Sequence, residues 1–95
     1  MAYGVISQWT SSAAFDAAME TEAREKYIPG IKALGAVNAF FIYTGDTTFS
    51  VISIYPDEAA ATAAAEKQKA LRAQAAAEMP VKMVGEVHGT VFASF

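Results

Sequence analysis

The sequence predicts an α+β domain whose elements follow the order strand, helix, strand, strand, helix, strand. Two runs of β-branched and aromatic residues, 40–43 and 49–55, are separated only by residues 44–48, and this pattern indicates a β-hairpin. A stretch with helical spacing lies on each side of the hairpin, and a further β-rich segment lies at each end of the chain. This order is that of a split βαβ unit, which forms a four-stranded antiparallel sheet with both helices on one face.

Composition limits the classes of function. The 95 residues fit one domain, residues 1–95, with one core. With 7 Lys and Arg against 10 Asp and Glu, the net charge of −3 argues against a nucleic-acid partner, which needs clustered positive charge. No cysteine is present, so disulfides and thiolate chemistry are excluded. No segment has the length of apolar sequence that crosses a membrane or the pattern of a signal peptide, and we expect a cytoplasmic protein.

The first strand and the first helix come from the N-terminal third of the chain. Residues 2–9 are rich in β-formers and predict the first strand. The hydroxyls of residues 10–12 can accept the free N–H groups of a helix, so we expect the helix to begin there. Its buried stripe is predicted from the four-residue spacing of Phe15, Met19, Ala23 and Tyr27. Pro29 predicts a kink or break, followed by a last helical turn over 31–35.

The second helix is the clearest in the sequence. Asp57 can cap it, and residues 58–79 contain no Gly or Pro before Pro80. The buried stripe is predicted to be Ala60, Ala64, Leu71, Ala75 and Met79. Solvent-facing positions are predicted at Lys67, Gln68, Lys69, Arg72 and Gln74. The small alanine side chains bury little area, so the helix contributes less hydrophobic stabilisation than its length suggests.

The last β-rich segment, 81–95, is too long for an ordinary strand, and Gly85 and Gly89 are natural positions for a bend or bulge. Period-two alternation then places Glu86 and His88 on the sheet face that the helices leave open. The hairpin strands are apolar on both faces, so this open face also carries apolar side chains from the hairpin. We expect a second copy of the chain to cover it in a sheet-to-sheet homodimer.

In its element order, its aromatic-rich hairpin and its helix start Tyr55-Pro56-Asp57-Glu58-Ala59-Ala60-Ala61, nearly the whole chain resembles the dimeric α+β barrel superfamily. This superfamily has a ferredoxin-like fold and includes antibiotic-biosynthesis-monooxygenase-like domains and many small proteins without known activity. The resemblance implies a dimer and a ligand pocket between the helices and the sheet of each subunit. None of the matching features is a catalytic signature.

Four residues are candidates for a binding site. His88, the only histidine, is the candidate catalytic base because Glu86 lies on the same face of its strand; the alternative is a surface or interface histidine. Trp9, Asn38 and Tyr43 could line a pocket with an apolar wall and a few hydrogen-bonding groups. The alternatives are core packing for Trp9 and Tyr43, and a local backbone hydrogen bond for Asn38. A lone histidine without cysteines predicts no metal site.

Three functions remain open from the sequence. The first is a cofactor-independent oxygenase acting on a small aromatic substrate, as the monooxygenase-like relatives suggest. The second is haem binding, as in other relatives, which needs an axial histidine on a helix, whereas His88 is predicted on a strand. The third is a dimeric domain that binds a small apolar or aromatic ligand, or only itself, without catalysis. We expect no cofactor for the first or the third.

Overall fold

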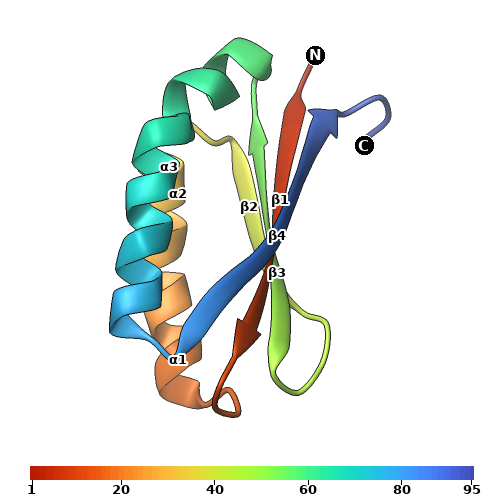
Figure 1. The fold of residues 1–95 in the computed structure, drawn as a ribbon. Helices are drawn as coiled ribbons and strands as arrows, with labels where there is room; N and C mark the ends of the chain where they lie inside the picture. The colour runs from red at the N-terminus through yellow and green to blue at the C-terminus, as the bar shows by residue number, and fades with distance from the viewer.

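The structure is a computed structural model that describes residues 1–95. The strands are β1 (Tyr3–Ser11), β2 (Asn38–Tyr43), β3 (Thr48–Tyr55) and β4 (Val81–Thr90). The helical elements are α1 (Ala17–Glu22), a π-turn η1 (Ala23–Tyr27), α2 (Ile28–Ala33) and α3 (Glu58–Glu78). The strands form one antiparallel sheet in the order β2-β3-β1-β4, and all the helices lie on one of its faces (Figure 1). The predicted fold is confirmed.

The first helix begins later than the sequence suggested. Residues up to Ser11 continue β1, and the side chain of Asp16 caps α1 by accepting the backbone N–H of Met19 at 2.9 Å. The prediction of a cap at residues 10–12 was therefore wrong. Pairing with β3 and β4 holds Thr10 and Ser11 in the sheet, and a carboxylate five residues later takes the capping role.

Pro29 does not interrupt the helix. Helical backbone runs from Ala17 to Ala33, and the irregularity is η1, which ends two residues before Pro29. The N–H of Ile28 bonds to the carbonyl of Ala23, five residues back, as in a π-helix. Proline occupies the second position of α2, near a helix start, where its missing N–H is tolerated. The expected break is thus replaced by a wider turn.

The second predicted helix corresponds to α3, and Asp57 caps it through the N–H of Ala60 at 2.8 Å. Its buried residues are Ala61, Ala64, Gln68 and Ala75. Ala64 and Ala75 were predicted to be buried, but Gln68 was assigned to solvent. This assignment was wrong, because the side chain of Gln68 points into the sheet and bonds to Ser53.

The last strand contains a bulge, and after it the side chains that would face away from the helices face toward them. Trp9 pairs with Met83 and Gln8 pairs with Gly85, so Val84 is an extra residue opposite β1. After this bulge, His88 lies opposite Val5, on the sheet face that the helices cover. Alternation without a bulge had placed Glu86 and His88 on the open face, and that prediction was wrong. The strand also ends at Thr90, and residues 91–95 are not strand.

The open sheet face is apolar. Cross-strand pairing places side chains from all four strands together on it: Ile6, Phe40, Ile42, Ile52, Ile54 and Val87. We call these six residues the open-face patch. Phe40, Ile42 and Val87 are 46%, 45% and 58% exposed, so in one chain about half of each side chain remains in water.

Two apolar clusters fill the space between the helices and the sheet. The closed-end cluster comprises Val5, Ile31, Ala36, Tyr55, Ala61 and Ala64. The hollow-end cluster comprises Trp9, Tyr27, Phe49, Ala75 and Val81. None of the helices has the length and apolar character that crossing a membrane requires.

Candidate ligand-binding site

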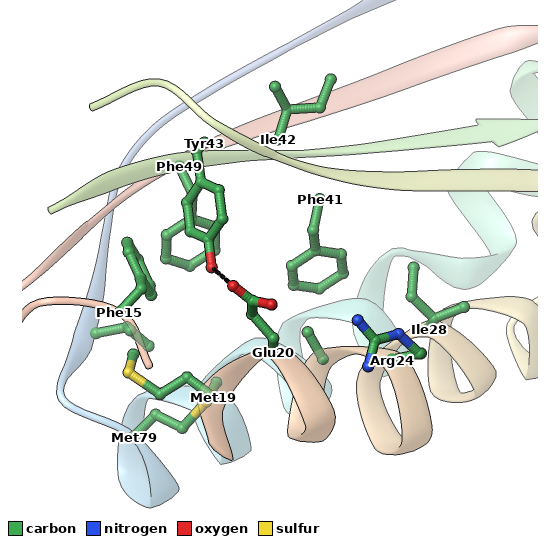
Figure 2. Close-up of a pocket in the computed structure, with 12 residues that line it drawn as sticks. Phe15, Met19, Glu20, Arg24, Ile28, Phe41, Ile42, Tyr43, Phe49 and Met79 are labelled. Atoms are coloured by element: carbon green, nitrogen blue, oxygen red, sulfur yellow. Dashed lines mark hydrogen bonds between the residues drawn. The ribbon is translucent and has the colours of Figure 1, made fainter. Parts of the chain in front are cut away.

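A cavity of about 340 Å³ lies between the first helix and the β2–β3 hairpin. The helix contributes side chains from successive turns of α1, η1 and α2, among them Met19, Ala23 and Ile28. The hairpin contributes Phe41 and Phe49, whose rings point from the sheet toward the helix (Figure 2). Ten of the twelve lining residues are hydrophobic. We call this space the outer cavity.

Aromatic rings form the rigid frame of the outer cavity. Phe49 is central: its ring stacks with Trp9 at 5.8 Å and with Phe41 at 6.1 Å between centroids. Phe15 meets the same ring edge-on at 5.1 Å, and Phe15 also lies 5.1 Å from the ring of Tyr43. Such offset and edge-to-face pairs are favourable and specify ring orientation. Flat rings of fixed orientation therefore enclose the space.

One polar pair crosses the cavity mouth. The hydroxyl of Tyr43 donates to the carboxylate of Glu20 at 2.6 Å and so joins β2 to α1 (Figure 2). This hydrogen bond, together with desolvation, raises the pKa of Tyr43. Arg24 lies one helical turn from Glu20 and also lines the cavity, without a salt bridge to any carboxylate. The mouth therefore carries one bonded polar pair and one free guanidinium.

A second, smaller space of about 40 Å³ lies deeper, between α3 and the centre of the sheet. We call it the inner chamber. It shares the walls Phe41, Phe49, Met79 and Val81 with the outer cavity. Its own lining includes three buried polar side chains, Ser7, Ser53 and Gln68. The indole N–H of Trp9 donates to the hydroxyl of Ser7 at 2.8 Å.

A hydrogen-bonded cluster holds the two helices together beside these spaces. The carboxylate of Glu78 accepts from Lys26, from the Tyr27 hydroxyl at 2.9 Å and from Gln74 at 2.9 Å. Donation from Lys26, Gln74 and Tyr27 lowers the pKa of Glu78 to about 2. Burial and the bond to Glu78 raise the pKa of Tyr27 to about 12. The cluster thus fixes the end of α3 against η1.

The structure brings two of the four predicted site residues together. Tyr43 lines the outer cavity, and Trp9 lines the inner chamber on the far side of Phe49. Asn38 lies on the open face of the sheet, where its side chain accepts the N–H of Ala39 at 3.0 Å. The fourth, His88, is exposed on β4 and lines neither space.

His88 belongs to a separate polar contact at the edge of the sheet. Its Nδ1 shares a hydrogen bond of 2.6 Å with the hydroxyl of Tyr3. Desolvation, and then the nearby carboxylate of Glu58, raise the pKa of Tyr3. Glu86, the expected neighbour of His88, instead forms a 2.7 Å salt bridge with Arg72 on α3. The structure therefore does not pair His88 with Glu86.

The sequence reasoning missed several residues of the site. Glu20 and Arg24 were not among the candidates and Gln68 was assigned to solvent, because charged and amide side chains in helices are usually exposed. Phe15 and Met19 were assigned to the core only. Met19 lies on the sheet side of the helix and Phe15 lies just before it, but periodicity carries no information about whether that side is filled.

The arrangement can bind an apolar molecule, and it contains few groups for catalysis. Neither space is lined by a histidine or an asparagine. The structure holds no group of three or more acidic, histidine or cysteine side chains placed to bind a metal ion. The groups at the mouth that could exchange a proton are Tyr43 and Glu20, which are bonded to each other.

Comparison with solved structures identifies the fold as ferredoxin-like. A dimeric ferredoxin-like protein from an uncultured marine organism superimposes with a TM-score of 0.67 at 12% identity, covering 99% of this chain and 98% of that chain. A protein of unknown function from Nitrosomonas europaea gives a TM-score of 0.60 at 22% identity, covering 100% and 94%.

A third neighbour is a variant of SnoaB, a cofactor-independent oxygenase from Streptomyces nogalater. It superimposes with a TM-score of 0.66 at 12% identity, covering 98% of this chain and 95% of that chain. No protein-family model matches the sequence, and no curated protein matches it. At these identities the neighbours establish the fold and leave the function to be argued from the site.

Proposed function

We propose that the protein is a homodimer that binds a small aromatic or apolar ligand in the outer cavity of each subunit. The observation that carries this proposal is the cavity itself, about 340 Å³ of space framed by aromatic rings. This volume lies within the range of small-molecule sites, about 300–1,000 Å³, which are mainly apolar with a few placed polar groups. Of the predicted ligand-binding residues, Tyr43 lines this space, and Trp9 lies behind Phe49 in the wall of the inner chamber. The proposal places the protein in the cytoplasm.

A planar ligand fits the shape of the site. The rings of Phe41 and Phe49 are stacked with 11° between their planes, so they present parallel edges to the cavity. A fused two- or three-ring molecule would bury most of its surface against such walls, and apolar burial contributes about 25 cal/mol per Å². The Tyr43–Glu20 bond would open to admit the ligand.

Thermal stability in the presence of 2-naphthol tests ligand binding. A ligand that binds only the folded state raises Tm as its concentration rises. We expect this rise in the wild-type protein and its loss in Ala23→Leu, which fills the cavity from the helix side. Ala63→Leu, on the exposed face of α3, is the matched control, and its Tm should still rise with 2-naphthol. If a panel of two- and three-ring aromatic compounds leaves the wild-type Tm unchanged, the proposal fails.

The open-face patch supports the homodimer. Its six side chains form a continuous apolar surface across all four strands, which monomers rarely leave in water. The neighbour from the marine organism is a dimeric protein of the same fold. A twofold axis through this face would stack two sheets and exclude the patch from water.

Mass measured by light scattering tests the dimer. We expect twice the chain mass for the wild type and the chain mass for Phe40→Glu, which places a charge in the patch. Val37→Glu is a control, since Val37 is 66% exposed and lies outside the patch. A wild-type protein that stays at the chain mass at high micromolar concentration contradicts this part of the proposal.

Cofactor-independent oxygenation is the second candidate, and its support is the neighbour SnoaB, which is such an oxygenase. An oxygen electrode with hydroxylated polycyclic aromatic compounds tests it. Uptake above the buffer control that falls in Trp9→Ala or Tyr43→Phe would favour an enzyme. His88→Ala should leave that uptake unchanged, because His88 does not line the cavity. Binding without oxygen uptake would contradict the oxygenase candidate and support ligand binding without catalysis.

A further inference from the structure

The inner chamber contains more hydrogen-bonding capacity than the protein uses. Gln68, Ser53 and Ser7 are only 7%, 1% and 2% exposed. Their side chains take part in two hydrogen bonds with protein groups, Gln68 Nε2 to Ser53 Oγ at 3.3 Å and Trp9 Nε1 to Ser7 Oγ at 2.8 Å. The carbonyl oxygen of Gln68 and the hydroxyl hydrogens of both serines therefore have no protein partner.

Such groups are costly to bury without partners. An unsatisfied buried donor or acceptor costs about 1–3 kcal/mol. The Tyr55 hydroxyl is the one side-chain polar atom that is fully buried without a partner, so the free carbonyl oxygen of Gln68 remains accessible to water. A cavity of about 15 Å³ or more with two to four polar partners holds water, whereas an apolar one stays dry. At about 40 Å³, with three polar side chains in its wall, the inner chamber meets both conditions.

The chamber is also connected to the proposed ligand site. Four residues line both spaces, so only side chains separate them. Met79 is the adaptable member of this wall, since its unbranched side chain can take several rotamers. Movement of Met79 would join the two spaces into one elongated site, with an aromatic outer part and a polar inner end.

The charges around the chamber are already paired. Arg72 lines it, but its guanidinium is held by Glu86 at 2.7 Å. Tyr27 also lines it, and the Tyr27 hydroxyl donates to Glu78. The free groups are therefore neutral, one amide and two hydroxyls. Neutral donors and acceptors suit a hydroxyl or a carbonyl, and an ionised carboxylate would lose its hydration without gaining a counter-charge.

We infer that the inner chamber is a hydrogen-bonding subsite, filled by water in the free protein and by a neutral hydroxyl or carbonyl group of the bound aromatic ligand. This inference rests on the proposed ligand binding. It names the ligand class as aromatic molecules with an uncharged polar group at one end. Gln68 is the specificity-determining residue. Its carbonyl oxygen can accept a hydrogen bond from a ligand hydroxyl, and its second N–H can donate to a ligand carbonyl.

Two probes of similar shape, 2-naphthol and 2-methylnaphthalene, test the specificity by calorimetric titration. The quantity compared is the ratio of their dissociation constants in each protein, so differences in their hydration cancel between proteins. We expect Gln68→Leu to shift this ratio about tenfold against 2-naphthol, the effect of roughly one net buried hydrogen bond. Gln74→Leu, an exposed glutamine of the same helix, should leave the ratio unchanged. Ser53→Ala replaces Gln68→Leu if the latter does not fold.

A high-resolution crystal structure of the free protein tests the same inference without a ligand. We expect an ordered water within hydrogen-bonding distance of the Gln68 carbonyl oxygen. A dry chamber overturns the inference, and so does a probe ratio that Gln68→Leu and Ser53→Ala leave unchanged. If neither these probes nor the rest of the aromatic panel binds the wild type, the proposed function fails, and the water alone then decides whether the chamber is a polar site. If both probes bind with an unchanged ratio, the proposed function stands and the subsite does not.

Discussion

The closed end and the hollow end of the molecule are built between the same sheet and the same helices, but they are packed differently. At the closed end, α3 meets the sheet through Ala61 and Ala64, and Tyr55 is completely buried. At the hollow end, the rings of Trp9 and Phe49 stand between the layers, and two spaces remain around them. Small side chains let the layers close, whereas rigid rings hold them apart. The position of large aromatic residues therefore decides where this fold has room for a ligand.

Removal of the central ring should have the largest effect. Phe49→Ala takes away the side chain that contacts three other aromatic rings, and we expect a loss of about 3–5 kcal/mol in the free energy of unfolding. Urea denaturation measures the loss. Phe92→Ala is the control, since Phe92 is 90% exposed and should change stability little. A small loss in Phe49→Ala would show that the rings do not support the hollow end.

An alanine-to-leucine substitution should destabilise the closed end and have little effect at the hollow end. Ala64→Leu overpacks the closed end, and we expect it to cost about 1–3 kcal/mol. Ala23→Leu extends into the outer cavity, where there is room, and should change stability by no more than about 0.5 kcal/mol. Denaturation of both variants under identical conditions checks the difference. Equal losses would contradict the contrast in packing.

The two buried tyrosines also differ between the ends. The hydroxyl of Tyr55, at the closed end, is buried without a hydrogen-bond partner, so Tyr55→Phe should raise stability by about 1 kcal/mol. The hydroxyl of Tyr27, at the hollow end, donates to Glu78, so Tyr27→Phe should lower stability by about 1 kcal/mol. Melting curves of the two variants measure both signs. The same sign in both would refute the assignment of one free and one bonded hydroxyl.

The smallest effect concerns pH, and we expect it from Glu78 and Tyr27 at the hollow end. The folded state lowers the pKa of Glu78 to about 2, so its contribution is present above the ordinary pKa near 4.5 and is lost as pH falls toward 2. The folded state raises the pKa of Tyr27 to about 12, so its contribution is lost as pH rises from 10 to 12. Glu78→Gln should flatten the acid side of a stability profile from pH 2 to 6. Because Glu78 is partly exposed, solvent screening keeps the change small.

The element order and the apolar open face could be predicted from the sequence because they depend on long, regular patterns. The hairpin and the cap at Asp57 appear where the sequence placed them. Of the predicted stripe, Tyr27 is buried, Met19 and Ala23 are half-buried on the helix, and Phe15 lies before the helix starts. The face of His88 could not be predicted, because one extra residue at Val84 reverses the alternation after it. Gly85 indicated a bend or bulge near this position, but whether a residue is inserted there depends on the pairing with β1.

The candidate site was predicted less completely than the fold. Trp9 and Tyr43 were selected because aromatic residues with a polar atom suit pocket walls, and each lines one of the two spaces. Gln68 and Glu20 were missed because their positions become special only when the helices meet the sheet. A cavity is unfilled volume between elements, so no single segment of the sequence can reveal it.

The π-turn η1 amounts to one additional residue wound into an otherwise regular helix. The wider turn takes up this residue, so the segment that carries Glu20 and the segment that carries Ile31 both keep their faces toward the sheet. A regular α-helix of the same length would rotate one segment by about 100° relative to the other. The π-turn is therefore what allows one helix to border the cavity with its first half and to fill the core with its second half.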